Sequence, residues 1–591
     1  MPDVTAGRTD RLGAGRPGGL RTLRLAGLGA GVVLAAGAYG AGALPTGGTG
    51  AAQVPDGWIS WLGLAGWFAG LAILTGVWWR LGLRIRRRPG SVPLGWLLRT
   101  GLLWAVPLLV APPVGSRDAY AYACQGALWL DGVDPYTMGV LPGGCVWADA
   151  VPALWRDTTT PYGPLAVALA GGAVAVARLV TASTDGQLLV AVALLRAEAV
   201  AGVLLVAGCL PRLARAGGVE PVRAAWLGLV SPLVLVHAIG GAHNDALVLG
   251  LVVAALALAA SDRTVGADPG SGTGRARVPV GVVVAVAAIA GGLLGLAVAI
   301  KVTAIVALPF ALLLAAARPD AAQPRTSRPD IAQPRTSRPD IAQPRTGEAE
   351  SGQSLPTLLP TVAVATVAGL AGAGLAFAGV SLATRLDLGW LGALSDTGRL
   401  VQWTSIPTGL GMAAGYLLRL LGRPEAVDGA VATARLAGLL ALAGTWGLLL
   451  VHGCRILVHG SRVHSSRVHS SRGASAADRT RTRRHLVGTT GVAFTALALL
   501  SPIFYPWYGL TAVAVLAAGL SADRWIRRVA VAVIVLSFLV LPGGLGLAVL
   551  TKLPGALLDV ALVAVLSAVA YRKWRRRSRA GRRNQRRVRR R

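Results

Sequence analysis

Charged and aromatic residues gather in one polar stretch of an otherwise apolar chain, between Ser116 and Tyr162. The stretch begins SRDAYAYACQGALWLDGVDPYTMG and ends WRDTTTPYGPL. Charges beside a bilayer are costly, so such a cluster favours a functional site. Its leading candidate is Asp118, which follows Arg117 at the start of an amphipathic pattern. A carboxylate there either caps a helix or removes a proton from a substrate hydroxyl as general base.

Two further groups in this stretch could bind a sugar. Asp118, Tyr122 and Gln125 would share one face of a helix, because residues three and four apart are neighbours there. Asp134 and Tyr136 flank a proline. This second pair predicts either an ordinary turn or a hydroxyl-binding carboxylate beside an aromatic platform.

Other candidates lie near the ends of apolar runs. They are Tyr162 in a rigid Pro-Tyr-Gly-Pro bend, the triplet His243, Asn244 and Asp245, the rare lysine Lys301, and the aromatic residues Trp403, Tyr505 and Trp507. The structural alternatives are a helix cap for the triplet, a snorkelling side chain for the lysine and an interfacial belt for the aromatic residues. The functional interpretation is phosphate binding by His243 and Lys301 and sugar binding by the others.

Composition predicts an all-α polytopic membrane protein. Of the 591 residues 54% are hydrophobic and 14% charged, and many apolar runs can cross roughly 30 Å of hydrocarbon. The alternating pattern of a β-barrel is absent. The net charge of +32 lies mostly beside apolar runs, which indicates positive-inside topology and contact with membrane lipids rather than nucleic acid.

Basic loops, placed in the cytoplasm, set the topology. The predicted spans are 24–44, 58–80, 93–112, 187–209, 222–240, 246–260, 280–299, 302–317, 357–382, 432–453, 486–504, 508–522, 529–549 and 553–571. Runs 163–181 and 405–421 are predicted not to cross. This gives about 14 spans, within a range of about 13 to 15, and both termini inside.

The chain then divides into one transmembrane unit, 24–571, between a basic cytoplasmic N-terminus, 1–23, and a basic cytoplasmic tail, 572–591. Residues 115–186 form a large extracytoplasmic loop, in which Cys124 and Cys145 either form a disulfide or remain free thiols. Low-complexity repeats predict disordered cytoplasmic linkers at 318–355 and 454–485. No cleavable signal is recognised at the N-terminus.

On this topology the polar segments around Asp118, His243, Lys301, Trp403 and Tyr505 fall on one side of the membrane. We therefore expect a cavity that opens there. The sequence shows neither a Gly-rich phosphate loop nor a convincing pair of metal-binding aspartates in the outer loops. No metal ligand or cofactor is assigned, and a divalent cation is left open.

An ordered set of motifs carries a resemblance to a known family. The motifs are RDAYAYACQG with DPYT, then WRDTTTPYGPL, GGAHNDAL, AIKVTAIVALPF, QWTSIPT and SPIFYPWY. Together they resemble the actinobacterial polyprenol-phosphomannose-dependent α-(1→6)-mannosyltransferases, the MptA/MptB group of the GT-C superfamily, with MptB closer. The two low-complexity linkers are not family features.

The resemblance implies a GT-C transmembrane bundle in the plasma membrane with an extracytoplasmic active site. It implies a polyprenyl-phosphate-mannose donor and an α-(1→6)-mannan glycolipid acceptor in lipomannan or lipoarabinomannan biosynthesis. The donor is β-linked and the product α-linked, so one displacement inverts C1. Asp118 falls where the family places its acidic catalytic residue, with Arg117, Lys301 and His243 available to stabilise the leaving phosphate.

Two alternatives remain at this point. One is another polyprenyl-phosphate-sugar transferase, for arabinose or glucose. The other is a lipid-sugar transporter or flippase, in which matching broken helices in internal repeats would be expected; the sequence shows no such repeats.

Overall fold

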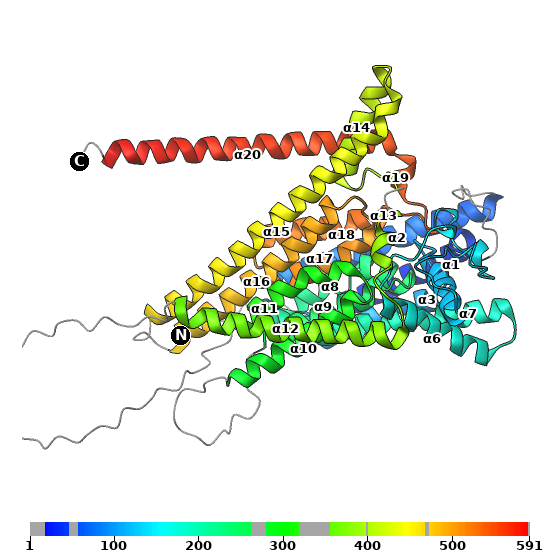
Figure 1. Cartoon of the computed structure of the whole chain (residues 1–591), viewed down its shortest axis with the longest axis horizontal. Coiled ribbons are helices and arrows are strands. Elements are labelled where there is room, and N and C mark those ends of the chain that lie inside the picture. The colour runs from blue at the N-terminus through cyan, green and yellow to red at the C-terminus, as the bar shows by residue number, and fades with distance from the viewer. Residues whose placement is uncertain are drawn as a thin grey trace, which may run out of the picture.

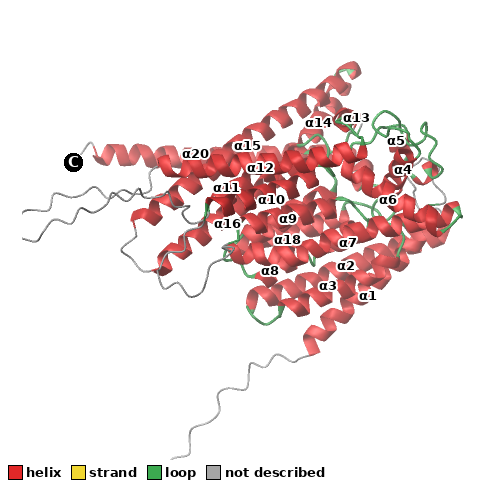
Figure 2. Cartoon of the chain, turned by 60° about the horizontal axis from the view of Figure 1, so that its bottom comes forward, coloured by secondary structure: helices red, strands yellow, loops and turns green. Residues whose placement is uncertain are grey.

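The computed structural model describes residues 18–45, 57–261, 279–317, 355–396, 400–466 and 472–588. These residues are helices and loops, and an isolated β-bridge between Val540 and Gly546 is their one extended pairing. The prediction of an all-α protein is confirmed. Loops gather at the end of the bundle that holds α4 and α5 (Figure 2).

The helical elements follow in chain order. They are α1 (Gly18–Ala41), α2 (Gly57–Arg87), α3 (Leu94–Val110), α4 (Asp118–Leu130), η1 (Ala148–Ala150), α5 (Ala153–Arg156), α6 (Pro164–Val180), α7 (Thr184–Ala216), α8 (Pro221–Gly228), η2 (Val234–Gly240), α9 (Asp245–Ala259), α10 (Val280–Val298), η3 (Val302–Ala307), α11 (Leu308–Ala316), α12 (Leu355–Thr384), α13 (Trp390–Asp396), α14 (Ile406–Leu420), η5 (Pro424–Ala426), α15 (Val427–Ser466), α16 (Arg472–Leu500), η6 (Pro506–Tyr508), α17 (Gly509–Gly519), α18 (Asp523–Phe538), α19 (Leu547–Leu550) and α20 (Lys552–Val588).

Among the described residues, seven helices are long and apolar enough to cross a membrane, or eight if the pair η2 and α9, bent by 112°, is one broken span. A multi-pass membrane protein is therefore confirmed. The predicted count of about 13 to 15 is not reached by this criterion. Several predicted spans are shorter or divided, because turns interrupt the apolar runs. The run 222–240 covers most of α8 and all of η2, and the run 529–549 covers the second part of α18, a turn and most of α19.

The predicted linker 454–485 differs from the structure where it is described. Helices α15 and α16 extend into the segment 454–485, so most of it is helical rather than disordered. Extending an existing helix by one residue costs little free energy compared with starting a new helix, so a long apolar helix readily continues into flanking Ala, Arg and Ser residues. Helix α20 continues into the predicted basic tail as far as Val588 and leaves the bundle as the red helix in Figure 1; the cytoplasmic position of this tail stays a prediction. The predicted linker 318–355, apart from its last residue, and residues 1–17 lie outside the described residues.

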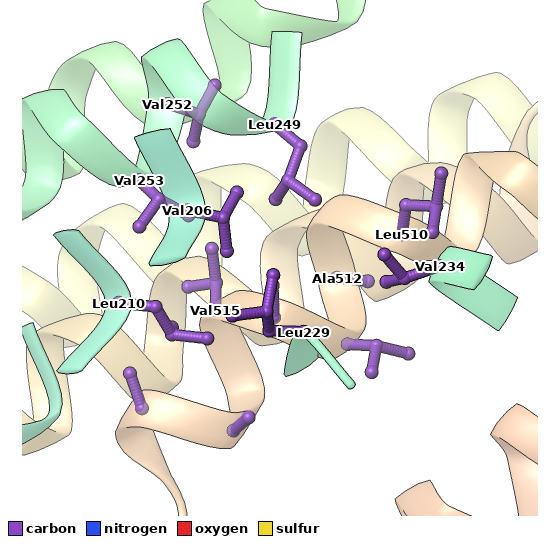
Figure 3. Close-up of a cluster of buried hydrophobic side chains, with 14 of the residues drawn as sticks. Val206, Leu210, Leu229, Val234, Leu249, Val252, Val253, Leu510, Ala512 and Val515 are labelled. Carbon is purple, nitrogen blue, oxygen red and sulfur yellow. The ribbon is translucent and has the colours of Figure 1, made fainter. Parts of the chain in front are cut away.

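A closely packed apolar core fixes the helices behind the polar end. Figure 3 shows side chains of α7, α9 and α17 interlocking, with Val206 and Leu210 facing Val253 and Val515. Small residues allow other helices to approach closely: a Cβ on Gly291 of α10 would lie 2.0 Å from the carbonyl oxygen of Gly369 in α12. Close backbone approach through small residues is typical of membrane helices.

Helix α4 is held at the polar end by three independent contacts. It packs against α6 and α7, and a disulfide joins its Cys124 to Cys145, with the two Cα atoms 5.5 Å apart. The Tyr120 hydroxyl donates a hydrogen bond to the Ala43 carbonyl at 2.6 Å. Of the two alternatives for the cysteines, the disulfide is confirmed. The non-crossing path of 163–181, which contains α6, stays a prediction.

Candidate active site

A cavity of about 330 Å³ lies where five segments far apart in the sequence meet. Its walls come from the start of α4, the loop after it, the 400–402 loop, the aromatic turn at 503–508, and the segment 541–549, together with one residue each from α1 and α2. The polar and aromatic residues among them are Ser116, Arg117, Asp118, Gln125, Trp155, Arg156, Thr158, Thr159, Tyr162, Gln402, Tyr505, Trp507 and Tyr508.

Asp118 is the first residue of α4 and its carboxylate faces this cavity, 17% exposed. The Ser116 hydroxyl accepts a hydrogen bond from the backbone N–H of Asp118 at 3.0 Å, so another side chain serves the helix start. Burial raises the pKa of Asp118 from 3.8 to about 6, against the opposing effects of the Ser116 hydrogen bond and the Lys301 charge; the charge of Asp245 adds to the rise. The carboxylate is thus largely ionised at neutral pH and more basic than usual, which suits a general base.

His243 lies directly behind this carboxylate. Its ring is fully buried and stacks on Trp507 with centroids 4.1 Å apart. Its Nδ1 is 3.5 Å from Oδ2 of Asp118, and neither ring nitrogen has a hydrogen-bond partner within the described part of the chain. The structure therefore places His243 against Asp118 rather than on the cavity surface.

Lys301 and Asp245 form a buried ion pair one layer behind the wall. The Lys301 ammonium lies 2.9 and 2.8 Å from the two oxygens of the Asp245 carboxylate. It also lies 4.5 Å from the ring centroid of Tyr508 and 5.7 Å from that of Tyr162, and both rings line the cavity. Snorkelling is therefore wrong for Lys301. Asn244, the neighbour of Asp245, is also buried, and its Oδ1 has no partner among the described residues.

Aromatic rings build the inner wall. Tyr505 stacks on Trp507 with centroids 4.5 Å apart and planes 8° apart, and both rings line the cavity. Tyr162 meets Tyr122 edge to face at 5.1 Å, with Tyr122 buried behind it. Trp507 is 5% exposed, so these rings pack inside the protein and are not a lipid-facing belt.

Three predicted sugar-binding residues lie elsewhere. The Asp134 carboxylate accepts a hydrogen bond from the backbone N–H of Tyr136 at 2.9 Å, as in an ordinary Asx turn. Tyr136 itself is buried in a small cluster with Trp390. Trp403 donates its indole N–H to the Thr551 hydroxyl at 3.0 Å. Their position in the sequence suggested a place in the site, but these local contacts hold their side chains outside the cavity.

Sequence reasoning missed the turn at 541–546, which it placed inside a span. The Gly115 N–H donates to the Pro542 carbonyl at 2.9 Å. Gly544 has φ +99°, and a Cβ there would lie 3.2 Å from the Cα of Ser116. The turn thus packs against the backbone that presents Asp118. The run LPGGLG at 541–546 was the available signal, since paired glycines after proline mark a turn.

Arg196 supports the same region from within α7. Its guanidinium donates to the Leu109 carbonyl at 2.7 Å and to the Gly240 carbonyl at 3.3 Å. It thereby connects the end of α3 with the end of η2. The first of these ends precedes Asp118 in the chain and the second precedes His243. A buried cation here satisfies carbonyls that helix ends leave open.

The described residues contain no group of three or more His, Cys, Asp or Glu side chains that could hold a metal ion.

Two family profiles match this chain. The profile "Alpha-(1->6)-mannopyranosyltransferase, N-terminal domain", of the MptA/MptB family, matches residues 24–317. The profile "MptB C-terminal domain" matches residues 476–571. The predicted resemblance is confirmed, and the second match agrees with the closer resemblance to MptB.

Curated relatives carry the same description. An alpha-(1->6)-mannopyranosyltransferase of Mycobacterium tuberculosis is 29% identical over 447 residues, which are 70% of this chain and 64% of the relative. Alpha-(1->6)-mannopyranosyltransferase B of Corynebacterium glutamicum is 27% identical over 89% of this chain and 78% of its own length. Alpha-(1->6)-mannopyranosyltransferase A of that species is 33% identical over 41% of this chain and 45% of its own length. No solved structure matches the chain.

Proposed function

This chain belongs to the alpha-(1->6)-mannopyranosyltransferase family of glycosyltransferases, and on that premise we propose that it moves mannose from polyprenyl-phosphate-mannose to an α-(1→6)-mannan acceptor. The acceptor would be a glycolipid of lipomannan or lipoarabinomannan biosynthesis. The reaction would take place on the extracytoplasmic side of the plasma membrane.

The observation that carries this proposal is the Asp118 carboxylate, which faces a cavity of about 330 Å³ with aromatic walls. In the proposed reaction it accepts the proton of the acceptor 6-hydroxyl as that oxygen attacks C1 of mannose. The C1–O bond to phosphate breaks as the new C1–O6 bond forms, and C1 inverts. The leaving group is a lipid phosphate, which departs with the bonding electron pair and needs no general acid.

Cationic groups around Asp118 support the departure of this phosphate. Arg117 lines the cavity beside the base, and its guanidinium is oriented by the Ala150 carbonyl at 3.2 Å. Lys301 would act through the wall formed by Tyr508 and Tyr162. Fixed charges in a site that excludes water stabilise developing charge more strongly than they would in water. His243, which contacts Asp118, would hold the carboxylate in position.

The experiment is a transfer assay in membranes or detergent with a labelled polyprenyl-phosphate-mannose donor. The wild-type protein should attach mannose to an α-(1→6)-linked mannoside acceptor. Asp118→Asn should lower kcat by roughly 10²-fold or more while the protein still binds donor. Asp185→Asn is the matched control, because Asp185 is exposed at the start of α7, away from the cavity.

If the protein transfers arabinose or glucose from the corresponding lipid donor and does not transfer mannose, the sugar named in this proposal is wrong. Wild-type turnover by Asp118→Asn would remove Asp118 as the base.

A further inference from the structure

The cavity wall differs in chemistry between its segments. The part formed by α1, α2 and the segment 541–549 is apolar, with Ala41, Leu64, Leu541, Leu545 and Val549. The part formed by α4 and the loop 151–162 carries hydrogen-bonding and aromatic groups, notably Gln125, Trp155 and Arg156. A lipid chain suits the first set and a sugar suits the second.

Gln125 is the strongest sign of a polar ligand. It lines the cavity yet is only 8% exposed. Its side-chain amide makes no hydrogen bond to any other described residue. An amide offers two donors and an acceptor, and neither atom of this amide is among the fully buried ones, so both are open to the cavity. A ligand with adjacent hydroxyl groups can supply partners for them.

Trp155 adds an aromatic surface to the same part of the wall. It belongs to the four-residue helix α5 and is half-buried, with one side packed on the cluster around α4. The Arg156 guanidinium fixes this short helix by donating to the Val151 carbonyl at 3.0 Å and to the Asp149 carbonyl at 2.8 Å. A preorganised aromatic ring beside a few fixed polar groups is a typical small-ligand wall.

Spacing along α4 relates these groups to the base. Gln125 follows Asp118 by seven residues, which is two turns or roughly 10 Å along the helix, on the same face. A sugar that hydrogen-bonds Gln125 can therefore extend along α4 toward the carboxylate. The neighbouring Ala153 and Leu154 line the cavity and are also exposed, so the cavity reaches the protein surface on this side, where the glycan part of the acceptor can enter.

We infer that Gln125 and Trp155 form the subsite for the acceptor glycan, with the mannose next to the reacting one stacked on Trp155 and hydrogen-bonded by Gln125, so that the terminal mannose reaches Asp118. This inference rests on the proposed function and assigns the two substrates to different parts of the cavity. The lipid donor occupies the apolar part, and both substrates meet at Asp118.

The test separates the two substrates. With a synthetic octyl glycoside of an α-(1→6)-linked mannose disaccharide as acceptor, Gln125→Ala and Trp155→Ala should each raise the acceptor KM about tenfold. The donor KM should stay within about twofold. Trp155→Phe should restore most of the affinity, because it keeps an aromatic face. Trp58→Ala is the control, since Trp58 is 74% exposed at the start of α2 and lies outside the cavity.

Binding without turnover keeps the inference independent of the reaction. Saturation-transfer NMR with the same glycoside on the full-length Asp118→Asn protein should show contact, and adding Trp155→Ala should abolish it. Unchanged acceptor affinity in both alanine variants would overturn the subsite, and so would a rise in donor KM instead. Absence of mannose transfer by the wild-type protein would overturn the proposed function instead, while the NMR result still decides the subsite.

Discussion

The pH dependence of transfer follows from the position of Asp118 and gives the sharpest test of its role. Burial raises its pKa to about 6 from a usual value of 3.8. Only the ionised carboxylate can accept a proton, so activity should fall as the pH drops through about 6. Between pH 7 and pH 5 the ionised fraction falls from about nine-tenths to about one-tenth, and kcat/KM should therefore fall about tenfold. An ordinary carboxyl would lose almost nothing over that range.

The hydrogen bond between the Ser116 hydroxyl and the Asp118 carboxylate, distinct from the one to the backbone N–H, provides the perturbation. It opposes the effect of burial by favouring the ionised carboxylate, so Ser116→Ala should move the acidic limb of the profile to higher pH. The direction follows because removing a group that lowers a pKa raises it.

The assay is kcat/KM for detergent-solubilised enzyme from pH 4.5 to 8.5 at constant ionic strength. The donor phosphodiester stays ionised throughout, so a limb near pH 6 reports the enzyme. A flat profile, or a limb centred near pH 4, would refute the assignment of Asp118 as a buried base. An acidic limb that moves downward in Ser116→Ala would refute the role given to the hydroxyl.

Three further predictions test how the site is built. The pKa of Asp118 is raised in the folded protein, so its ionised form destabilises the fold fully above about pH 6 and not at all below about pH 3.8. Asp118→Asn should therefore raise the melting temperature at pH 7.5, and this gain should disappear toward pH 4. Gly544→Ala should lower kcat about tenfold or more, because Gly544 has φ +99° and approaches the Ser116 backbone, so that a side chain there would displace Asp118. Gly132 has φ +78° and open space around it, so Gly132→Ala should cost similar backbone strain without this loss of kcat. Equal kcat in the two variants would contradict the reasoning. Lys301→Met should destabilise the protein by roughly 3–5 kcal/mol, because it leaves Asp245 buried and unpaired, and it should also lower kcat. In chemical unfolding, the double variant Lys301→Met with Asp245→Leu should recover much of the stability, while its kcat should stay low. A single variant as stable as the double would show that the pair is not buried as described.

The amino-acid sequence alone determined the class of the protein and the part of the chain in which its candidate site lies. Long apolar runs and juxtamembrane arginines are local properties, so they predicted an all-helical membrane bundle without any knowledge of packing. The polar loop predicted where chemistry would be found, and Arg117, Asp118, Gln125, Tyr505 and Trp507 do line one cavity.

Only the tertiary structure decided which residues face that cavity and which lie behind its wall. Lys301 and His243 carry suitable chemistry and lie close by, yet an ion pair and a stacked ring hold them in a second layer. The Asp134 carboxylate accepts a hydrogen bond within its own turn, and the turn at 541–546 reaches Ser116 from more than four hundred residues away in the chain. Hydropathy and spacing describe one element at a time, whereas the direction of a side chain is set by the elements that pack against it, and these are distant in sequence.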